Sequence, residues 1–330
     1  MQKDSFKGSE FQFIERIRKQ FSFAGSELGI GDDCAVIPFS DSESYLITSD
    51  ALVEDVHFAL NTTSFKDLGW KALAVNLSDL AAMGGIPKYF FISIAVPKTI
   101  SHNDLTFFYD GIKDISNEFN VTLLGGDTTA SKKHFFISIT VVGMGRNDKI
   151  LLRTGAKAGD KIYVTGTLGD SAAGLFLLRN QAVKQRNDNP MIQKHLRPIP
   201  RIHEMTFFNA HYKIHSAIDL SDGLSGDLGH ILSESDLGAH LLWENLPLSA
   251  DLLRWEDKHQ VEGFVLHGGE DYEVLFTSPE DINTEDLLRK HKIMLGKIGE
   301  ITDSKGLQLT KDGSQIPILP SSFDHFKDNM

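Results

Sequence analysis

Apolar residues along the first half of the chain follow two alternating spacings, one typical of strands and one typical of helices. Runs rich in Ile, Val, Leu and Phe predict short strands at 45–49, 89–96, 121–125 and 135–143. Between these runs, apolar residues recur at helical spacing after Ser64 and after Ser101. An aspartate follows each serine three residues later, in the capping-box pattern of a helix start. We therefore expect a mixed α/β region here.

The second half mixes strands and helices without strict alternation, which favours an α+β domain. Strands are predicted at 161–166, 216–219, 239–243, 272–277 and 296–302. Helices are predicted at 169–180 and from about Leu224, and the polar stretch 185–195 predicts an exposed loop. The pattern pauses at 146–149. We therefore expect two domains, 1–148 (mixed α/β) and 149–330 (α+β).

Composition narrows the class of protein. A chain of 330 residues is long for one core, which agrees with two domains. The net charge of -12 argues against a nucleic-acid partner, because such surfaces need clustered Lys and Arg. One cysteine, Cys34, excludes a disulfide within the chain. The charged first twenty residues and the lack of long apolar runs predict a cytoplasmic protein with no membrane partner.

Acidic residues recur where strands are predicted to end. Asp50, Asp127 and Asp219 each close an apolar strand, and Asp33 lies in the turn GIGDDCA. Asp222 follows Asp219 across another turn. Ligands of α/β sheets usually bind at the carboxyl ends of strands. A single aspartate is normally a solvated surface residue, but this recurrence favours a shared site.

Asp79 lies within the apolar helix WKALAVNLSDLAAMGG. A carboxylate in such surroundings is unfavourable unless a partner or a metal compensates it. The alternative is that Asp79 faces solvent on a polar stripe with Asn76, and the helix alone leaves both interpretations open.

Converging carboxylates would repel one another, so they would persist only around cations. Oxygen ligands without His or Cys favour Mg²⁺ over zinc, and Mg²⁺ is commonly shared with substrate phosphates. These residues therefore predict a nucleotide-dependent enzyme with several magnesium ions. The sequence has neither a GxxxxGK[ST] P-loop nor the glycine loop, HRD and DFG motifs of protein kinases.

Ten short motifs, in order along nearly the whole chain, carry a family resemblance. They are GIGDDCA (29–35), TSD (48–50), VHF (56–58), NLSDLAAMGG (76–85), GGDTT (125–129), RTGAKAGD (153–160), VTGTLGDSAAGL (164–175), HLRPIPR (195–201), AIDLSDGLSGDLGHI (217–231) and GGEDYEVLFT (268–277). Together they resemble the thiamine-monophosphate kinase family, in the superfamily of aminoimidazole ribonucleotide synthetase and selenophosphate synthetase.

The resemblance implies a homodimer of two-domain chains that uses ATP to phosphorylate thiamine monophosphate to thiamine diphosphate. It implies magnesium ligands at Asp33, Thr48, Ser49, Asp50, Asp79, Asp127, Asp219 and Asp222. It implies ATP contacts at Tyr109, Gly126, Asp127, Arg153 and Ser221. It implies contacts to thiamine monophosphate at His57, Glu270 and Phe323, where Phe stands for the Tyr or Trp that is common in the family.

The chemistry of this reaction agrees with the residues. A phosphate monoester has a second pKa near ~6, so its attacking oxygen is already ionised at neutral pH and needs no general base. The sequence accordingly has no convincing Ser-His-Asp or Cys-His arrangement. The expected catalytic group is the metal cluster itself, formed by Asp33, Asp50, Asp79, Asp127 and Asp222, with direct in-line transfer.

Two alternatives remain at this stage. A synthetase of the same superfamily would keep the aspartates and ATP but activate a carbonyl oxygen, and the motifs GGEDYEVLFT and RTGAKAGD argue against it. A non-catalytic nucleotide-binding protein would tolerate the loss of several aspartates, yet all the expected ones are present.

Overall fold

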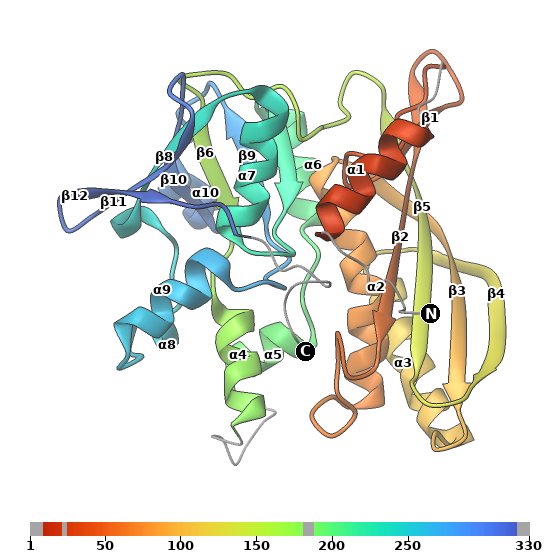
Figure 1. The fold of residues 1–330 in the computed structure, drawn as a ribbon. Helices are drawn as coiled ribbons and strands as arrows, with labels where there is room; N and C mark the ends of the chain where they lie inside the picture. Colours follow the sequence, from red (N-terminus) through yellow and green to blue (C-terminus); the bar gives the residue numbers. More distant parts are fainter. Residues whose placement is uncertain (1–8, 22–24, 181–187, 322–330) are drawn as a thin grey trace, which may run out of the picture.

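The computed structural model describes residues 9–21, 25–180 and 188–321 of the chain. Two sheets, one built from each half of the sequence, stand on either side of helix α2 (Figure 1). The predicted fold class is confirmed, because a mixed α/β N-terminal half is followed by an α+β C-terminal half.

The N-terminal sheet has five strands in the order β1-β2-β5-β3-β4, of which only the pair β3–β4 is parallel. Its strands are β1 (Ala35–Pro38), β2 (Glu43–Val53), β3 (Ile86–Pro97), β4 (Thr122–Ser131) and β5 (Phe136–Arg146). Helices α2 (Phe65–Ala82) and α3 (His102–Glu118) lie on one face of this sheet, and α1 (Glu10–Gln20) precedes it (Figure 1).

The C-terminal sheet has seven strands in the order β12-β11-β8-β10-β6-β9-β7. They are β6 (Lys161–Thr165), β7 (Ser216–Asp219), β8 (Gly238–Leu242), β9 (Val274–Ser278), β10 (Leu295–Thr302), β11 (Gly306–Lys311) and β12 (Ser314–Ile318). Its helices are α4 (Asp170–Arg179), α5 (Pro190–Leu196), α6 (Ile202–His211), α7 (Leu224–Ser235), α8 (Ala250–Leu253), α9 (Lys258–His267) and α10 (Thr284–His291), with the 3-10 turn η2 (Trp243–Asn245).

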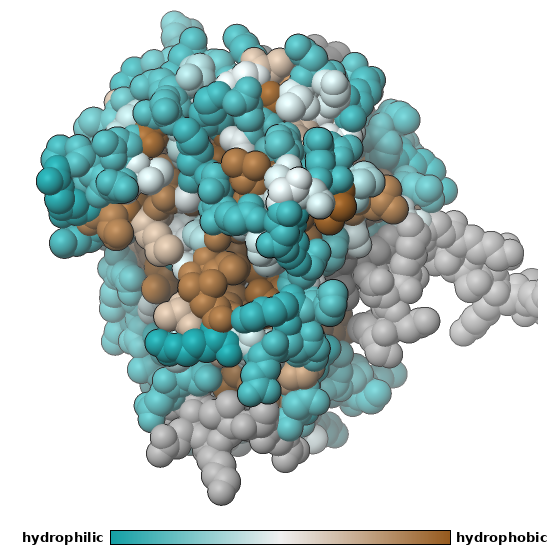
Figure 2. All heavy atoms as spheres, turned by 90° about the vertical axis from the view of Figure 1, so that its left-hand side faces the viewer, coloured by the Kyte–Doolittle hydropathy of each residue, from teal (hydrophilic) through white to brown (hydrophobic). Residues whose placement is uncertain are grey.

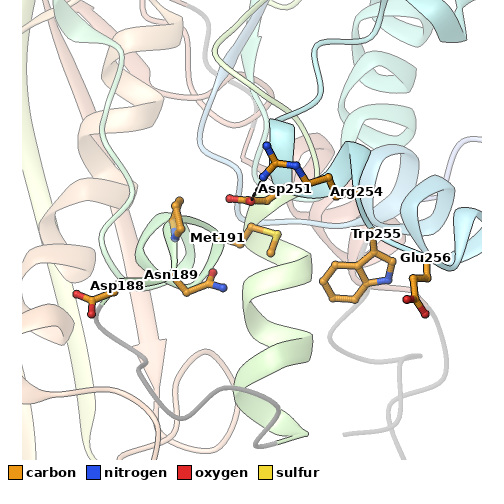
Figure 3. A pocket seen from close by; sticks show the side chains of 8 residues that line it. Asp188, Asn189, Met191, Asp251, Arg254, Trp255 and Glu256 are labelled. Carbon is orange, nitrogen blue, oxygen red and sulfur yellow. Dashed lines mark hydrogen bonds and ion pairs between the residues drawn. The ribbon is translucent and has the colours of Figure 1, made fainter.

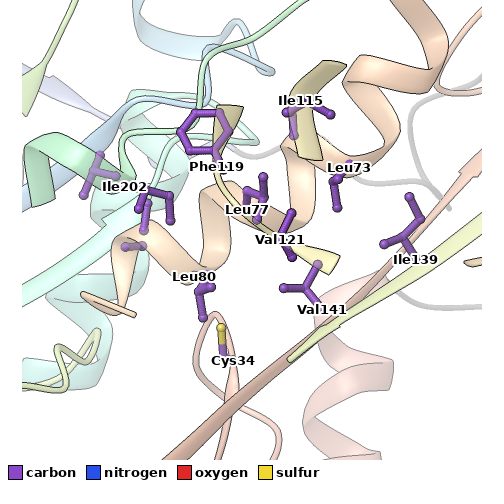
Figure 4. Packing of buried hydrophobic residues seen from close by; sticks show 14 of the residues in the cluster. Cys34, Leu73, Leu77, Leu80, Ile115, Phe119, Val121, Ile139, Val141 and Ile202 are labelled. Atoms are coloured by element: carbon purple, nitrogen blue, oxygen red, sulfur yellow. The ribbon is translucent and has the colours of Figure 1, made fainter. Parts of the chain in front are cut away.

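Helix α2 is the central element of the molecule. Fourteen of its 18 residues are buried, because it contacts β2, β3 and β5 of one sheet and β7 and β9 of the other. Figure 4 shows Leu73, Leu77 and Leu80 of α2 packing with Val141 of β5 and Ile202 of α6 in one continuous core. Burying a leucine side chain fully contributes roughly 1.5–3 kcal/mol, so this helix holds the two halves together. Any polar residue of α2 is consequently forced into the interior.

The predicted helix starts are confirmed at both serines. Ser64 accepts a hydrogen bond from the backbone N–H of Asp67 at 3.1 Å, and Ser101 does the same for Asp104 at 3.2 Å. Such N-caps satisfy backbone donors that the first helical turn leaves open.

Two predictions about strand ends are wrong. Asp50 and Asp127 do not close their strands, because β2 continues to Val53 and β4 to Ser131. β2 stays paired with β5 as far as Val53, and β4 pairs with β3 along its polar half. β4 lies at the edge of the sheet and is exposed along nearly its whole length, so its second half can be polar. The polar residues after Gly126 therefore gave no sign that the strand continues. Asp219 does end β7 as predicted.

The predicted exposed loop at 185–195 is also wrong where the structure describes it. Residues 190–196 form α5, capped by Asn189 with Pro190 in its first turn. Ile192 and Leu196 are buried against Leu178 of α4. The pair Asn-Pro is a helix-start signal that the polar composition of the stretch obscured. Residues 185–187 lie outside the described part.

Between the two sheets the chain crosses a connection without regular structure. β5 ends at Arg146 and β6 begins at Lys161, so the expected division between residues 148 and 149 falls in this connection and stays a prediction. The face of the C-terminal half turned away from the N-terminal sheet is largely hydrophilic around a local apolar patch (Figure 2). Among the described residues, no helix combines the length and apolar character required to cross a bilayer.

Candidate active site

Three carboxylates from distant parts of the chain meet where α2 passes between the sheets. Asp33 comes from the turn before β1, Asp79 from α2, and Asp219 from the last residue of β7, with one ligand oxygen from each lying within 4.8 Å of the others. Thr48 of β2 donates a hydrogen bond to Asp79 Oδ2 at 2.5 Å, and Ser78 donates to Asp219 Oδ2 at 2.8 Å. These three aspartates, with the adjacent Asp50 of β2, are called the carboxylate cluster below.

The carboxylate cluster is electrostatically unfavourable on its own. Burial raises the pKa of Asp33, Asp79 and Asp219, and neighbouring carboxylates raise the pKa of Asp79 and Asp219 further. Burial and the charge of Asp33 likewise raise the pKa of Asp50 to about 6. Carboxylates with these shifts favour either a proton or a bound cation. The solvent-facing alternative for Asp79 is therefore wrong, because its side chain points into this cluster.

Asp33 has one oxygen occupied and one without a partner. Arg153 donates from Nε to Asp33 Oδ1 at 2.9 Å and forms a second bond from Nη2 to the same oxygen. Asp33 Oδ2 is buried and has no hydrogen-bond partner among the described residues. A buried carboxylate oxygen without a donor is unfavourable by about 1–3 kcal/mol or more, so this atom fits a cation ligand.

Asp32, which the sequence analysis did not assign, positions the turn. It accepts the backbone N–H of Asp33 at 3.1 Å and that of Arg153 at 3.1 Å. Burial, followed by the charge of Asp33, raises the pKa of Asp32 to about 7. Asp32 thus fixes both partners of the Arg153–Asp33 pair through their backbones.

Asp227 holds the turn that carries Ser221 and Asp222. Its Oδ2 accepts the backbone N–H groups of Asp222 at 3.1 Å and Gly223 at 3.0 Å. Asp227 is buried, and burial together with Asp222 and Asp219 raises its pKa well above the usual value. This residue was missed too, although a carboxylate in the first turn of a helix is a recognisable signal for such a role.

The motif GGED lies beside this turn. The backbone N–H of Glu270 donates to the carbonyl oxygen of Ser221 at 2.7 Å. The Glu270 carboxylate pairs with Lys71 Nζ at 2.9 Å and lies 3.3 Å from His195 Nδ1. Burial would raise the pKa of Glu270, but the charge of Lys71 more than offsets it, so the pKa is lowered. His57, the other predicted acceptor contact, accepts a hydrogen bond on its Nδ1 from the backbone N–H of Val53 at 3.1 Å.

Other predicted site residues lie apart from the cluster. Asp127 is exposed on β4. Strands β5 and β3 lie between β4 and β2, the strand of Asp50, so three strand spacings, roughly 14 Å, separate β4 from β2. Ser49 points to the opposite face of β2 from Thr48, where its Oγ lies 2.9 Å from Thr140 Oγ1. Within one chain, neither side chain reaches the carboxylate cluster.

Close packing constrains Gly126 and Tyr109, two of the predicted ATP contacts. Gly126 has a φ of +156°, and a Cβ there would lie 1.7 Å from the carbonyl oxygen of Ile92, so only glycine fits. Tyr109 of α3 is half-buried against the core, edge-on to Phe108 at 5.5 Å between ring centroids. Phe323 lies outside the described residues.

A separate open pocket of about 600 Å³ lies between the start of α5 and α8 (Figure 3). Its lining residues are Asp188, Asn189, Pro190, Met191, Asp251, Arg254, Trp255 and Glu256. None of them is a predicted site residue, so the carboxylate cluster and not this pocket defines the candidate active site.

Fold and site together define the class of protein. Residues 31–145 match the model of the AIR synthase related protein N-terminal domain, and residues 157–312 match that of its C-terminal domain. The solved structure of AaThiL complexed with AMPPCP and TMP is similar over 96% of this chain and 97% of that chain, with a TM-score of 0.83 and 33% identity.

Sequence relatives narrow the class further. The thiamine-monophosphate kinase of Haemophilus influenzae is 42% identical over 330 residues, covering 97% of this chain and 98% of that protein. The thiamine-monophosphate kinase of Escherichia coli K12 is 42% identical over 325 residues, covering 96% and 98%. The chain belongs to the thiamine-monophosphate kinase family.

Proposed function

We propose that this chain transfers the γ-phosphoryl group of ATP directly to the phosphate of thiamine monophosphate, with the help of several magnesium ions. The activity itself, ATP-dependent phosphorylation of thiamine monophosphate, is that of the family. The observation that carries the magnesium part of the proposal is the meeting of Asp33, Asp79 and Asp219 in one buried place.

The residues of the site fit magnesium. Asp33 Oδ2 is buried and has no partner in the described part of the chain, and the neighbouring ligand atoms are carboxylate and hydroxyl oxygens, which Mg²⁺ prefers. We propose that Asp33, Thr48, Asp50, Asp79, Asp219 and Asp222 hold the ions. Bound magnesium would neutralise phosphate charge and align donor and acceptor.

The chain's own residues bind and orient the two substrates in this proposal. Arg153, tied to Asp33, offers a planar guanidinium to the ATP phosphates. Ser221 and Asp222 lie on a turn that Asp227 fixes through two backbone bonds. The acceptor lies near Glu270, and no residue is needed to remove a proton from its ionised phosphate.

We further propose that the active protein is a homodimer that pairs through the N-terminal sheet. The face of this sheet that α2 and α3 leave open carries large apolar side chains on neighbouring strands, and β4 is an edge strand among the residues that the structure describes. The exposed residues are Tyr45, Ile86, Tyr89, Phe91, Leu124 and Phe136. Exposed apolar patches of this kind are typical of interfaces. Ser49 and Asp127, which do not reach the carboxylate cluster, belong to this surface, and we propose that they act there.

We propose a cytoplasmic location and no nucleic-acid or membrane partner. The net charge of -12 supports the lack of a nucleic-acid partner.

The test is ATP turnover with Mg²⁺, with and without thiamine monophosphate, followed by chromatography of thiamine diphosphate. We expect one thiamine diphosphate per ADP, and loss of transfer without loss of fold in Asp127→Asn and Asp222→Asn. Near-normal turnover in Asp222→Asn would contradict the metal sites, and near-normal turnover in Asp127→Asn would contradict a role of the sheet surface in the reaction. ATP consumption without thiamine diphosphate would instead favour the synthetase alternative and a carbonyl acceptor.

A further inference from the structure

Lys71 is a lysine in the interior of the protein. Its side chain is only 1% exposed, because α2 is enclosed between the two sheets. Taking an ammonium group out of water is strongly unfavourable unless a close negative partner compensates it. Lysine is otherwise among the residues found least often in protein interiors. A buried lysine at this position therefore needs a negatively charged partner.

That partner is the Glu270 carboxylate, whose two oxygens have separate contacts. Oε1 receives Lys71 Nζ at 2.9 Å, and Oε2 lies 3.3 Å from His195 Nδ1, which is itself 3.1 Å from Ser171 Oγ. Burial, followed by the charge of Lys71, lowers the pKa of His195 to about 3, so the ring is neutral. Lys71 is thus the cation that compensates Glu270, while the neutral His195 lies beside the second oxygen and is itself held by Ser171.

The backbone under Glu270 is equally constrained. Glu270 has a φ of +66°, which is uncommon for a residue with a side chain. Its N–H is bonded to Ser221 O, and a Cβ at Gly269 would lie 2.6 Å from that same oxygen. Strained backbone of this kind is characteristic of functional sites. The side chain is 25% exposed, in contrast to the 1% of Lys71, so a ligand can reach Glu270 but not Lys71.

The positive charge of Lys71 also reduces the repulsion between Glu270 and a phosphate group. An isolated Glu270 carboxylate would repel an incoming phosphate dianion, and the nearby carboxylate cluster would add to that repulsion. With Lys71 at 2.9 Å the pair is neutral as a unit, yet its carboxylate still accepts hydrogen bonds. Thiamine offers such a carboxylate an amino donor on its pyrimidine ring and a positive charge on its thiazolium ring.

We propose that Lys71 is a positioning residue for the acceptor, which holds the Glu270 carboxylate in the orientation that recognises the thiamine part of thiamine monophosphate. The inference rests on the proposed function and adds a residue of α2 to acceptor recognition. Lys71 itself does not touch the acceptor, since its ammonium group is closed off from solvent.

The experiment compares Lys71→Met, which keeps the length of the side chain but removes its charge, with the wild-type chain. We expect the KM for thiamine monophosphate to rise about tenfold and the KM for ATP to change less than twofold, the size expected for one charged hydrogen bond. Lys71→Arg keeps the charge and should recover part of the loss. The matched control is Lys66→Met on the same helix, whose exposed ion pair with Asp114 should leave both KM values unchanged.

A double-mutant cycle with Glu270→Gln decides whether Lys71 acts through Glu270. If it does, Glu270→Gln and the double variant should have the same KM for thiamine monophosphate. A multiplicative increase in the double variant, or a fall in kcat with an unchanged KM in Lys71→Met, would overturn the proposal. If Lys71→Met does not fold, as judged by circular dichroism, the Glu270→Gln background carries the comparison, because no unpaired carboxylate remains there.

Different results would refute the proposed function and the positioning role of Lys71. A wild-type chain that makes no thiamine diphosphate would refute the proposed function itself. A wild-type chain that makes it, with the same acceptor KM in Lys71→Met, would refute only the positioning role.

Discussion

Arg153 is bonded to Asp33 through a single carboxylate oxygen, and the other oxygen of Asp33 is buried without a partner among the described residues. Burial lowers the pKa of the guanidinium, but Asp33 and Asp32 more than offset this effect, so Arg153 stays charged. One cation therefore faces a cluster of several carboxylates. Arg153 is the counter-ion that makes the metal-free cluster tolerable, and it leaves the remaining oxygen of Asp33 for a metal.

Replacing Arg153 should destabilise the metal-free protein more than the metal-bound one. We expect Arg153→Met to lower the free energy of unfolding by about 3 kcal/mol in EDTA, since it leaves a buried charge uncompensated. Added Mg²⁺ should then stabilise the variant more than it stabilises the wild type. Urea unfolding with EDTA and with Mg²⁺ measures both effects.

The control for this experiment is Arg146→Met, because Arg146 and its partner Asp148 are 68% and 62% exposed. Exposed ion pairs contribute about 0–1 kcal/mol, so little change is expected. Equal stability of Arg153→Met and wild type in EDTA would contradict the counter-ion role.

Replacing a metal-binding aspartate by asparagine should have the opposite effect on the stability of the metal-free protein. Asp79→Asn and Asp219→Asn remove buried charges that repel their neighbours, so the metal-free variants should be as stable as the wild type or more stable. The stabilisation by Mg²⁺ should disappear, because ligands stabilise by binding the folded state. Turnover should fall at least about 100-fold, which corresponds to about 2.7 kcal/mol of lost transition-state stabilisation.

Thermal unfolding with and without Mg²⁺, together with the ATP turnover assay, checks this prediction. Asp148→Asn on the surface is the control. Asparagine variants that lose stability in EDTA but keep their response to Mg²⁺ would show that these aspartates are structural.

Sequence pattern predicted the parts of the fold that depend on neighbouring residues. The start of α2 at Ser64 and the end of β7 at Asp219 follow from local capping and from a short apolar run. Asp50 and Asp127 were expected at strand ends because polar residues normally end buried strands. Their strands continue through pairing with distant segments, which local composition does not encode.

The pairing of Lys71 with Glu270 was equally beyond local pattern. The two residues are far apart in the sequence, and an isolated lysine in a helix is expected to be solvated. Its burial follows from the second sheet, which covers the face of α2 that the first sheet leaves open. Asp32 and Asp227 were missed for a related reason, since they act on backbone groups of their own turns instead of on a ligand.

The neutral His195 predicts how stability changes with pH. The pKa of this histidine is lowered to about 3 in the folded protein, against about 6.5 when unfolded. Between these values the unfolded state binds more protons, so the free energy of unfolding falls as pH falls below 6.5. The contribution of His195 to this loss is roughly 2 kcal/mol between pH 7.5 and pH 5.

His195→Gln keeps a polar group beside Ser171 but cannot be protonated in this range. We therefore expect a flatter dependence of stability on pH below 6.5 in the variant, measured by urea unfolding at several pH values. Because Gln also changes packing, the informative quantity is the slope and not the stability at one pH. Identical slopes in variant and wild type would contradict a buried neutral histidine.

The open face of the N-terminal sheet predicts how the chain assembles. Phe91 of β3 is 42% exposed and Leu124 of the edge strand β4 is 54% exposed, on a sheet whose opposite face is already covered by α2 and α3. Stable interfaces bury on the order of 1,600 Å² and are apolar at their centre, which such a surface can supply. We expect the wild-type chain to sediment as a dimer, and Phe91→Glu and Leu124→Glu to sediment as monomers with unchanged circular dichroism.

Leu253→Glu is the matched control, because Leu253 is 60% exposed on α8 of the other half and should leave the dimer intact. A monomeric wild type, or dimers in both sheet variants, would contradict pairing through this face and leave Ser49 and Asp127 without their proposed surface.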